Sequence, residues 1–134
     1  MRSLVSLLCL AALLGGCGAP ANRTSQATSQ PPAGEALPAP FSGENAGQTA
    51  TFTLAGGDYI VDWTATDTSS SGVGCYFAPA LKEDGGAGYE SLPDAEPEGG
   101  GTKSGSANLH DVAGGRWYFD IITHCAWTLA IKKG

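Results

Sequence analysis

The stretch that decides the fold reads Ala-Gly-Gly-Asp-Tyr-Ile-Val-Asp-Trp, residues 55–63. Tyr59, Val61 and Trp63 stand at every second position, the alternation typical of a strand with one buried face. This stretch aligns without gaps on Ala-Gly-Gly-Arg-Trp-Tyr-Phe-Asp-Ile, residues 113–121. A short apolar strand pattern precedes each Gly-Gly pair, so each pair is predicted to form the turn of a β-hairpin.

The two copies extend into a repeat of three predicted strands each. Cys75-Tyr76-Phe77 follows the first copy and Cys125-Ala126-Trp127 follows the second, each with a cysteine two residues before an aromatic ring. No stretch of residues 41–134 has a sustained 3.6-residue apolar period, which indicates an all-β class. We expect a small antiparallel β-sandwich, jelly-roll-like, of about six to eight strands, in which two three-stranded units face each other.

Cys75 and Cys125 alternate in phase with the apolar residues of their predicted strands, so both are expected to point to the buried face. No Cys-x-x-Cys motif accompanies them to suggest a redox or metal role. We therefore predict a structural disulfide between Cys75 and Cys125. Closing a loop of about 50 residues stabilises a fold by roughly 4 kcal/mol.

The N-terminal residues have the pattern of an export signal. Arg2 is followed by about eleven mostly apolar residues ending at Leu14, too few for a membrane-spanning helix. Leu14-Gly15-Gly16-Cys17 resembles the lipobox of bacterial lipoproteins. The alternative is an ordinary secretory signal cut near Ala19 or Ala21.

The lipobox resemblance implies that residues 1–16 are removed and that Cys17 receives a thioether-linked diacylglycerol. Cys9 is then discarded and Cys17 is capped, which leaves Cys75 and Cys125 to pair. Several acyl chains together anchor a protein effectively permanently. Residues 17–40 are rich in Ala, Pro, Ser, Thr and Gln and are predicted to be a disordered tether; residues 41–134 are predicted to be the β-sandwich domain.

The charge balance excludes some classes of partner. The chain has seven Lys and Arg residues, one of them Arg2 in the predicted leader, against thirteen Asp and Glu residues. This acidity argues against binding to nucleic acid phosphates and against electrostatic attraction to anionic lipid.

A family resemblance rests on three motifs: residues 52–59 (Phe-Thr-Leu-Ala-Gly-Gly-Asp-Tyr), 114–120 (Gly-Gly-Arg-Trp-Tyr-Phe-Asp) and 127–131 (Trp-Thr-Leu-Ala-Ile). They resemble the small β-sandwiches known as prepeptidase C-terminal domains, which are appended to secreted bacterial proteases and other exported proteins. The resemblance implies a β-sandwich with an accessory or binding role.

The sequence offers no credible catalytic set. His110-Asp111 with Ser104 and Ser106 is the nearest approach to a Ser-His-Asp site, but the serines lie in a predicted strand and not on a sharp nucleophile turn. Zinc needs three or four convergent ligands, which two histidines and paired cysteines do not supply. We expect no enzyme activity, no catalytic metal and no cofactor. The acidic, glycine-rich stretch 82–101 is interpreted as a solvated loop, with calcium binding as the alternative.

Aromatic and acidic residues on the outer faces of the strands are candidates for binding a ligand. Asp62 and Asp120 occupy matching positions of the repeat, although Asp is disfavoured in strands. One interpretation is that these charges keep the sheets soluble and block edge pairing. The other is a shallow platform for a sugar, with five candidate residues: Asp62, Tyr76, Tyr89, Tyr118 and Asp120.

The sequence as a whole predicts a non-catalytic lipoprotein, exported and lipid-anchored at the bacterial cell membrane or outer membrane. Its expected partners are the lipid bilayer, reached through acylated Cys17, and an envelope protein or a glycan. We expect a monomer. The alternative is a module that binds a carbohydrate or another small ligand, with calcium as a stabilising ion.

Overall fold

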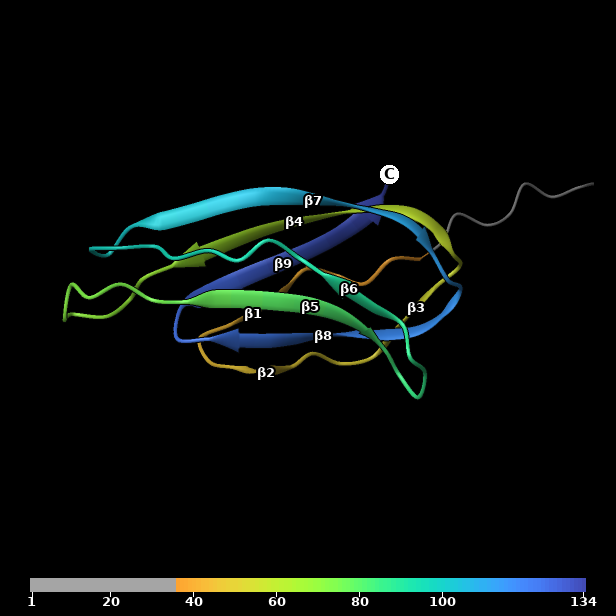
Figure 1. The fold of residues 1–134 in the computed structure, drawn as a ribbon, viewed down its shortest axis with the longest axis horizontal. Coiled ribbons are helices and arrows are strands. Elements are labelled where there is room, and N and C mark those ends of the chain that lie inside the picture. The colour runs from red at the N-terminus through yellow and green to blue at the C-terminus, as the bar shows by residue number, and fades with distance from the viewer. Residues whose placement is uncertain (1–35) are drawn as a thin grey trace, which may run out of the picture. The chain divides into compact units, whose positions relative to one another are not determined.

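The structure, a computed structural model, describes residues 36–134 as two antiparallel sheets packed face to face (Figure 1). Sheet A has the strand order β1-β9-β4-β7, and sheet B has the order β2-β8-β5-β6, with β3 also pairing with β8. The strands are β1 (Phe41–Gly43), β2 (Gly47–Gln48), β3 (Phe52–Leu54), β4 (Gly57–Thr66), β5 (Phe77–Glu83), β6 (Tyr89–Ser91), β7 (Thr102–Val112), β8 (Gly115–Thr123) and β9 (Ala126–Lys133).

The predicted all-β class is confirmed, and the strand order is that of a jelly roll. β2 pairs with residues 120–121 of β8 and β3 pairs with residues 115–117, so the two short strands share one edge of sheet B. Because two short strands share this edge, the described residues contain nine strands, one more than the upper limit of the predicted six to eight. Counted as one strand, β2 and β3 leave two layers of four, the arrangement of a double-sheet jelly roll.

The core lies between the sheets and consists of the alternating residues of the long strands. Along β4 the four alternating side chains at positions 59, 61, 63 and 65 are buried, and the intervening ones are only partly covered. β8 and β9 follow the same alternation. Each fully buried large apolar side chain contributes about 1.5–3 kcal/mol. The predicted buried face of Tyr59, Val61 and Trp63 is confirmed. The core of these three strands consists of Tyr59, Val61, Trp63, Ala65, Trp117, Phe119, Ile121, Trp127, Leu129 and Ile131.

The prediction that the Gly-Gly pairs form hairpins is wrong. β3 belongs to sheet B and β4 to sheet A, and β7 and β8 lie in opposite sheets as well, so each pair turns a corner between the two layers. Gly56 has φ 94°, which favours glycine. A Cβ atom on Gly56 would lie 3.0 Å from the backbone nitrogen of Gly114, and one on Gly114 would lie 3.0 Å from the carbonyl oxygen of Ala55. The glycines therefore allow the two corners to touch backbone to backbone.

The repeat is present in the fold, but its two units interleave. Leu54 pairs with Gly115 where β3 meets β8, and the equivalent positions Val112 and Gly57 pair where β7 meets β4. β5 lies beside β8 in sheet B as β9 lies beside β4 in sheet A. The first unit, β3-β4-β5, and the second unit, β7-β8-β9, therefore each contribute strands to both sheets. The expectation that each unit forms a layer of its own is wrong, because the Gly-Gly corners send consecutive strands to opposite layers.

The predicted disulfide between Cys75 and Cys125 is confirmed, with a Cα–Cα distance of 5.4 Å. Cys75 lies shortly before β5 and Cys125 directly before β9, and both are buried in the core. The bond therefore joins equivalent points of the two units.

Several sequence-based predictions lie outside the described residues: the signal peptide 1–16, the lipidated Cys17 and the tether up to residue 35. Residues 36–134 contain no helix with the length and hydrophobicity that a membrane span requires. Leu37, at the end of the predicted tether, packs against the core.

Candidate ligand-binding surfaces

The five residues predicted to form a ligand platform do not come together. Asp62 lies on the outer face of sheet A, whereas Tyr118 and Asp120 lie on the outer face of sheet B, because they alternate with buried residues on β4 and β8 respectively. Tyr89 lies on β6 at the edge of sheet B, and Tyr76 lies beside Cys75 just before β5. A single platform built from both aspartates is excluded by the sandwich between them.

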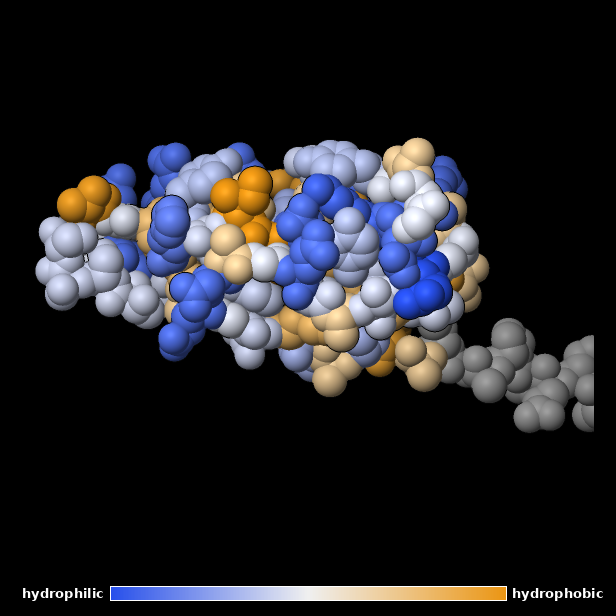
Figure 2. All heavy atoms as spheres, turned by 90° about the horizontal axis from the view of Figure 1, so that it is seen from below, coloured by the Kyte–Doolittle hydropathy of each residue, from blue (hydrophilic) through white to orange (hydrophobic). Residues whose placement is uncertain are grey.

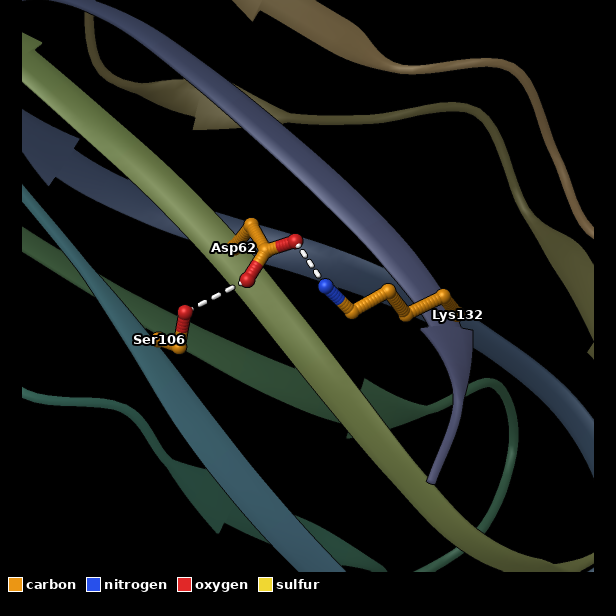
Figure 3. A network of polar contacts seen from close by, with 3 residues as sticks. All are labelled: Asp62, Ser106 and Lys132. Atoms are coloured by element: carbon orange, nitrogen blue, oxygen red, sulfur yellow. Dashed lines mark hydrogen bonds and ion pairs between the residues drawn. The ribbon is translucent and has the colours of Figure 1, made fainter.

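Asp62 is held in a polar network on the outer face of sheet A (Figure 3). Lys132 Nζ donates to its Oδ2 at 2.6 Å, and Ser106 Oγ donates to its Oδ1 at 2.5 Å. These hydrogen bonds, with that from Lys132 the larger cause, lower the pKa of Asp62. The three residues come from β4, β9 and β7, so the network ties three neighbouring strands together.

Asp120 has the equivalent partner on sheet B. Lys82 Nζ donates to Asp120 Oδ2 at 2.5 Å, and this hydrogen bond raises the pKa of Lys82. The same ammonium lies 5.9 Å from the centre of the Tyr89 ring, and Lys82 is paired in register with Tyr118. Lys82 and Lys132 occupy equivalent positions after Leu81 and Ile131, so each sheet carries one Lys–Asp pair on its outer face.

These pairs explain why aspartate is tolerated at matching positions in two strands. An exposed ion pair contributes little to stability, but it leaves neither strand with an uncompensated charge. The side of the molecule shown in Figure 2 is mostly hydrophilic or intermediate, and its hydrophobic atoms form small separate groups. The pairing of Lys82 and Lys132 with these aspartates was not predicted from the sequence, because alternation indicates the face on which a residue lies and not its neighbour on the next strand.

Tyr76 belongs to a different surface, a groove of about 530 Å³ where the two sheets open at one edge. Tyr76 is 38% exposed, and its hydroxyl donates to Asp94 Oδ2 at 2.9 Å. The groove lies between the segment 94–96 and the first residues of β7. Its lining residues are Trp63, Tyr76, Asp94, Ala95, Glu96, Lys103 and Ser104.

Trp63 in this groove carries an unsatisfied polar atom. The side chain is only 8% exposed, and its indole N–H is buried without a hydrogen-bond partner among the described residues. Leaving a buried donor unpaired costs about 1–3 kcal/mol. The ring lies directly against Gly105, since a Cβ atom there would be 2.7 Å from Trp63 Cζ2. The sequence pattern places Trp63 in the core alone, because nothing in the alternation distinguishes a core tryptophan from one that also lines a groove.

A second hollow of about 320 Å³ lies beside Cys75 and shares Tyr76 and Glu96 with the groove. Val73, which is 83% exposed, and His124 also line it. Both hollows therefore lie around the same loops, at the end of the sandwich where β4 ends and β5 begins.

The acidic stretch 82–101 is more ordered than the predicted loop. Lys82 and Glu83 end β5, β6 forms within the stretch, and Ala95 makes an isolated bridge with Phe77. Glu83 Oε2 accepts the backbone N–H of Gly88 at 3.0 Å. Residues 36–134 hold no cluster of three or more His, Cys, Asp or Glu side chains placed to bind a metal ion.

The residues considered for hydrolysis have other partners. Ser106 Oγ donates to Asp62, and His110 lies 3.7 Å from the Asp58 carboxylate on the exposed surface. No hydrogen bond within the described residues joins His110 to Ser104 or Ser106, so the geometry of a nucleophile with its base is not formed there.

Comparison with known proteins adds no relative. No protein-family model, no curated protein and no solved structure matches this chain. The resemblances to lipoproteins and to prepeptidase C-terminal domains rest on the motifs quoted above.

Proposed function

We propose that the protein is a non-catalytic lipoprotein, anchored through acyl chains on Cys17, that displays a β-sandwich binding domain outside the cytoplasm. The observation that carries this proposal is the order of its N-terminal sequence: a short apolar run, then Gly15-Gly16, then Cys17. A short apolar segment directs export, and a lipidated cysteine at its end retains the product at a membrane.

The disulfide supports export from an independent part of the chain. Protein disulfides persist in oxidising compartments and are rare in the cytosol. The bonded pair, Cys75 and Cys125, is the pair that remains after a leader containing Cys9 is removed and Cys17 is acylated. The proposal thus gives each of the four cysteines one role.

The placement of the chain ends supports display of one end of the domain. In Figure 1 the described chain begins near the same end of the sandwich as the C-terminus, and the loop after β4 lies at the opposite end. That opposite end carries exposed Val73 and Tyr76 and the two hollows. A domain held at the first end presents these features away from its attachment.

The test is the intact mass of the mature protein extracted from its native membrane. We expect a chain that begins at Cys17 and carries the mass of a diacylglycerol, with or without a further acyl group. A Cys17→Ser variant should lose the lipid and keep its leader. A Cys9→Ser variant is the matched control and should be processed normally. An unmodified thiol at Cys17, or an uncut leader in the unaltered protein, contradicts the proposal.

A further inference from the structure

The groove beside Tyr76 has walls of opposite charge. Asp94 and Glu96 lie on the wall formed by the segment 94–96, and Lys103 and Ser104 lie on the wall formed by β7. A cationic ligand would meet Lys103, and an anionic ligand would meet the two carboxylates. A neutral ligand whose groups both donate and accept hydrogen bonds satisfies both walls.

Two aromatic side chains complete the groove. The Tyr76 ring is partly exposed there, with its hydroxyl fixed by Asp94, so the orientation of the ring is set before any ligand arrives. Rigid aromatic surface of this kind provides contact area at little cost in conformational entropy. The second ring, that of Trp63, supplies an N–H that lacks an acceptor.

Another tryptophan of sheet A shows what such an N–H requires. Trp127 lies against Gly43 as Trp63 lies against Gly105, with the same 2.7 Å from the ring to an added Cβ atom. Trp127 Nε1, however, donates to the carbonyl oxygen of Asn45 at 3.1 Å. At the other edge of the sheet the corresponding acceptor is missing for Trp63.

This N–H lies near an edge of the sandwich, because β7 is the edge strand of sheet A and pairs only with β4. Gly105 has no side chain to hold that edge in place. Binding to a groove oxygen requires Ser104 and Gly105 to shift so that the indole N–H, buried in this structure, becomes exposed.

We propose that this groove binds a neutral saccharide, with Tyr76 stacking on a sugar ring and the Trp63 N–H donating to a sugar oxygen. The inference rests on the proposed function, since it names the ligand that the displayed domain binds. The volume of the groove lies within the range of small-molecule sites. A peptide strand added to β7 would contact many consecutive residues of that strand. Lys103 and Ser104, however, are the only residues of β7 that line the groove.

The experiment begins with an array of neutral oligosaccharides probed with the detergent-extracted full chain. The oligosaccharide that binds most tightly is then titrated against variants in solution. Tyr76→Ala is expected to lose affinity by about tenfold. Tyr76→Phe, which keeps the ring, should stay within about threefold of the unaltered protein. Tyr89→Ala removes an exposed tyrosine from the edge of sheet B and should bind as the unaltered protein does.

The indole resonances give a readout that needs no substitution. The chain has three tryptophans, and the N–H groups of Trp117 and Trp127 already donate to the carbonyl oxygens of Ala113 and Asn45. Addition of the oligosaccharide should shift the Trp63 indole N–H signal and leave those of Trp117 and Trp127 in place.

Three results overturn the proposal: no neutral saccharide binds, Tyr76→Ala binds as tightly as Tyr89→Ala, or the Trp63 indole signal stays fixed at saturation. A peptide that binds in this groove when no saccharide does is also a contradiction. None of these results bears on the lipid at Cys17, which the intact mass measures separately.

Discussion

The two repeat units of the sandwich share a backbone plan and differ in one connection. In the second unit β8 passes to β9 through residues 124–125, whereas in the first unit β4 passes to β5 through residues 67–76. Asp67 holds the longer connection, because its carboxylate accepts the backbone N–H groups of Ser69 and Gly100. The hollows lie beside this connection. The repeat therefore builds the scaffold, and the departure from the repeat builds the candidate site.

The disulfide joins the equivalent cysteines of the two units, and its loss should have the largest effect. Changing both Cys75 and Cys125 to Ala is expected to lower the free energy of unfolding by about 4 kcal/mol, because the unfolded chain regains the freedom of a long loop. Denaturant unfolding under oxidising conditions measures the change. The unaltered protein with a reductant should unfold like the double variant. A loss below about 1 kcal/mol would show that the bond does little to hold the two units together.

The glycine corners are equivalent in the repeat but should not be equally sensitive. Gly56→Ala is expected to cost about 3 kcal/mol, since it combines a left-handed φ with a close backbone contact. Gly114→Ala brings the close contact alone, so about 2 kcal/mol is expected. Gly72→Ala, in the longer connection, is the matched control: it has a left-handed φ but no atom within 4 Å, so it should cost about 1 kcal/mol. Equal losses at all three positions would contradict contact between the corners.

Each unit also contributes a tryptophan that lies over a glycine, and the two should respond differently to phenylalanine. Trp127→Phe removes a hydrogen bond and leaves the Asn45 carbonyl without its donor, whereas Trp63→Phe removes a donor that has no partner. We expect Trp127→Phe to be the more destabilising by about 1 kcal/mol. Thermal unfolding of both variants measures the difference. A larger loss for Trp63→Phe would mean that its N–H already has an acceptor.

The smallest effect concerns the Lys–Asp pairs on the two outer faces. The lowered pKa of Asp62 means that the folded state holds its proton less tightly than the unfolded state does. Stability from this pair is complete above the ordinary aspartate pKa of about 3.9 and is lost as the pH falls through the lowered value. Asp62→Asn should therefore flatten the decline of the thermal midpoint below about pH 5. An unchanged decline would show that the carboxylate is not stabilised by its partners.

On sheet B the raised pKa of Lys82 makes stability depend on pH in the opposite direction. Its contribution is complete below the ordinary lysine pKa of about 10.4 and is lost as the pH rises through the raised value. Lys82→Met should therefore flatten the decline of the thermal midpoint at alkaline pH, because the group that loses its proton there is gone. Thermal midpoints between about pH 9 and pH 12 measure this effect.

The sequence predicted the features that depend on local pattern. Alternation placed Tyr59 and Val61 in the core, and the phase of Cys75 and Cys125 predicted the disulfide. Gly-Gly pairs were misread because positive φ serves a corner between layers as well as a hairpin. The prediction of a single ligand platform failed for a related reason. Alternation indicates that Asp62 and Asp120 point outward, but it does not indicate that they belong to different sheets.

The groove could not be predicted from the sequence, because its walls are far apart in the chain. Trp63, Tyr76 and Lys103 come from β4, from the segment before β5 and from β7. They meet only when the two sheets stack and the segment 94–96 bridges to Phe77. The unpaired Trp63 N–H is visible only from its neighbours in space.

The interleaving of the units has a consequence for damage to the chain. A protease that cuts the connection between β6 and β7 severs the polypeptide between the units, but β4 still pairs with β7 and β9, and β8 still pairs with β3 and β5. The Cys75–Cys125 bond links the resulting fragments covalently. A nicked molecule would therefore stay in one piece, and its break would be visible only after reduction and unfolding.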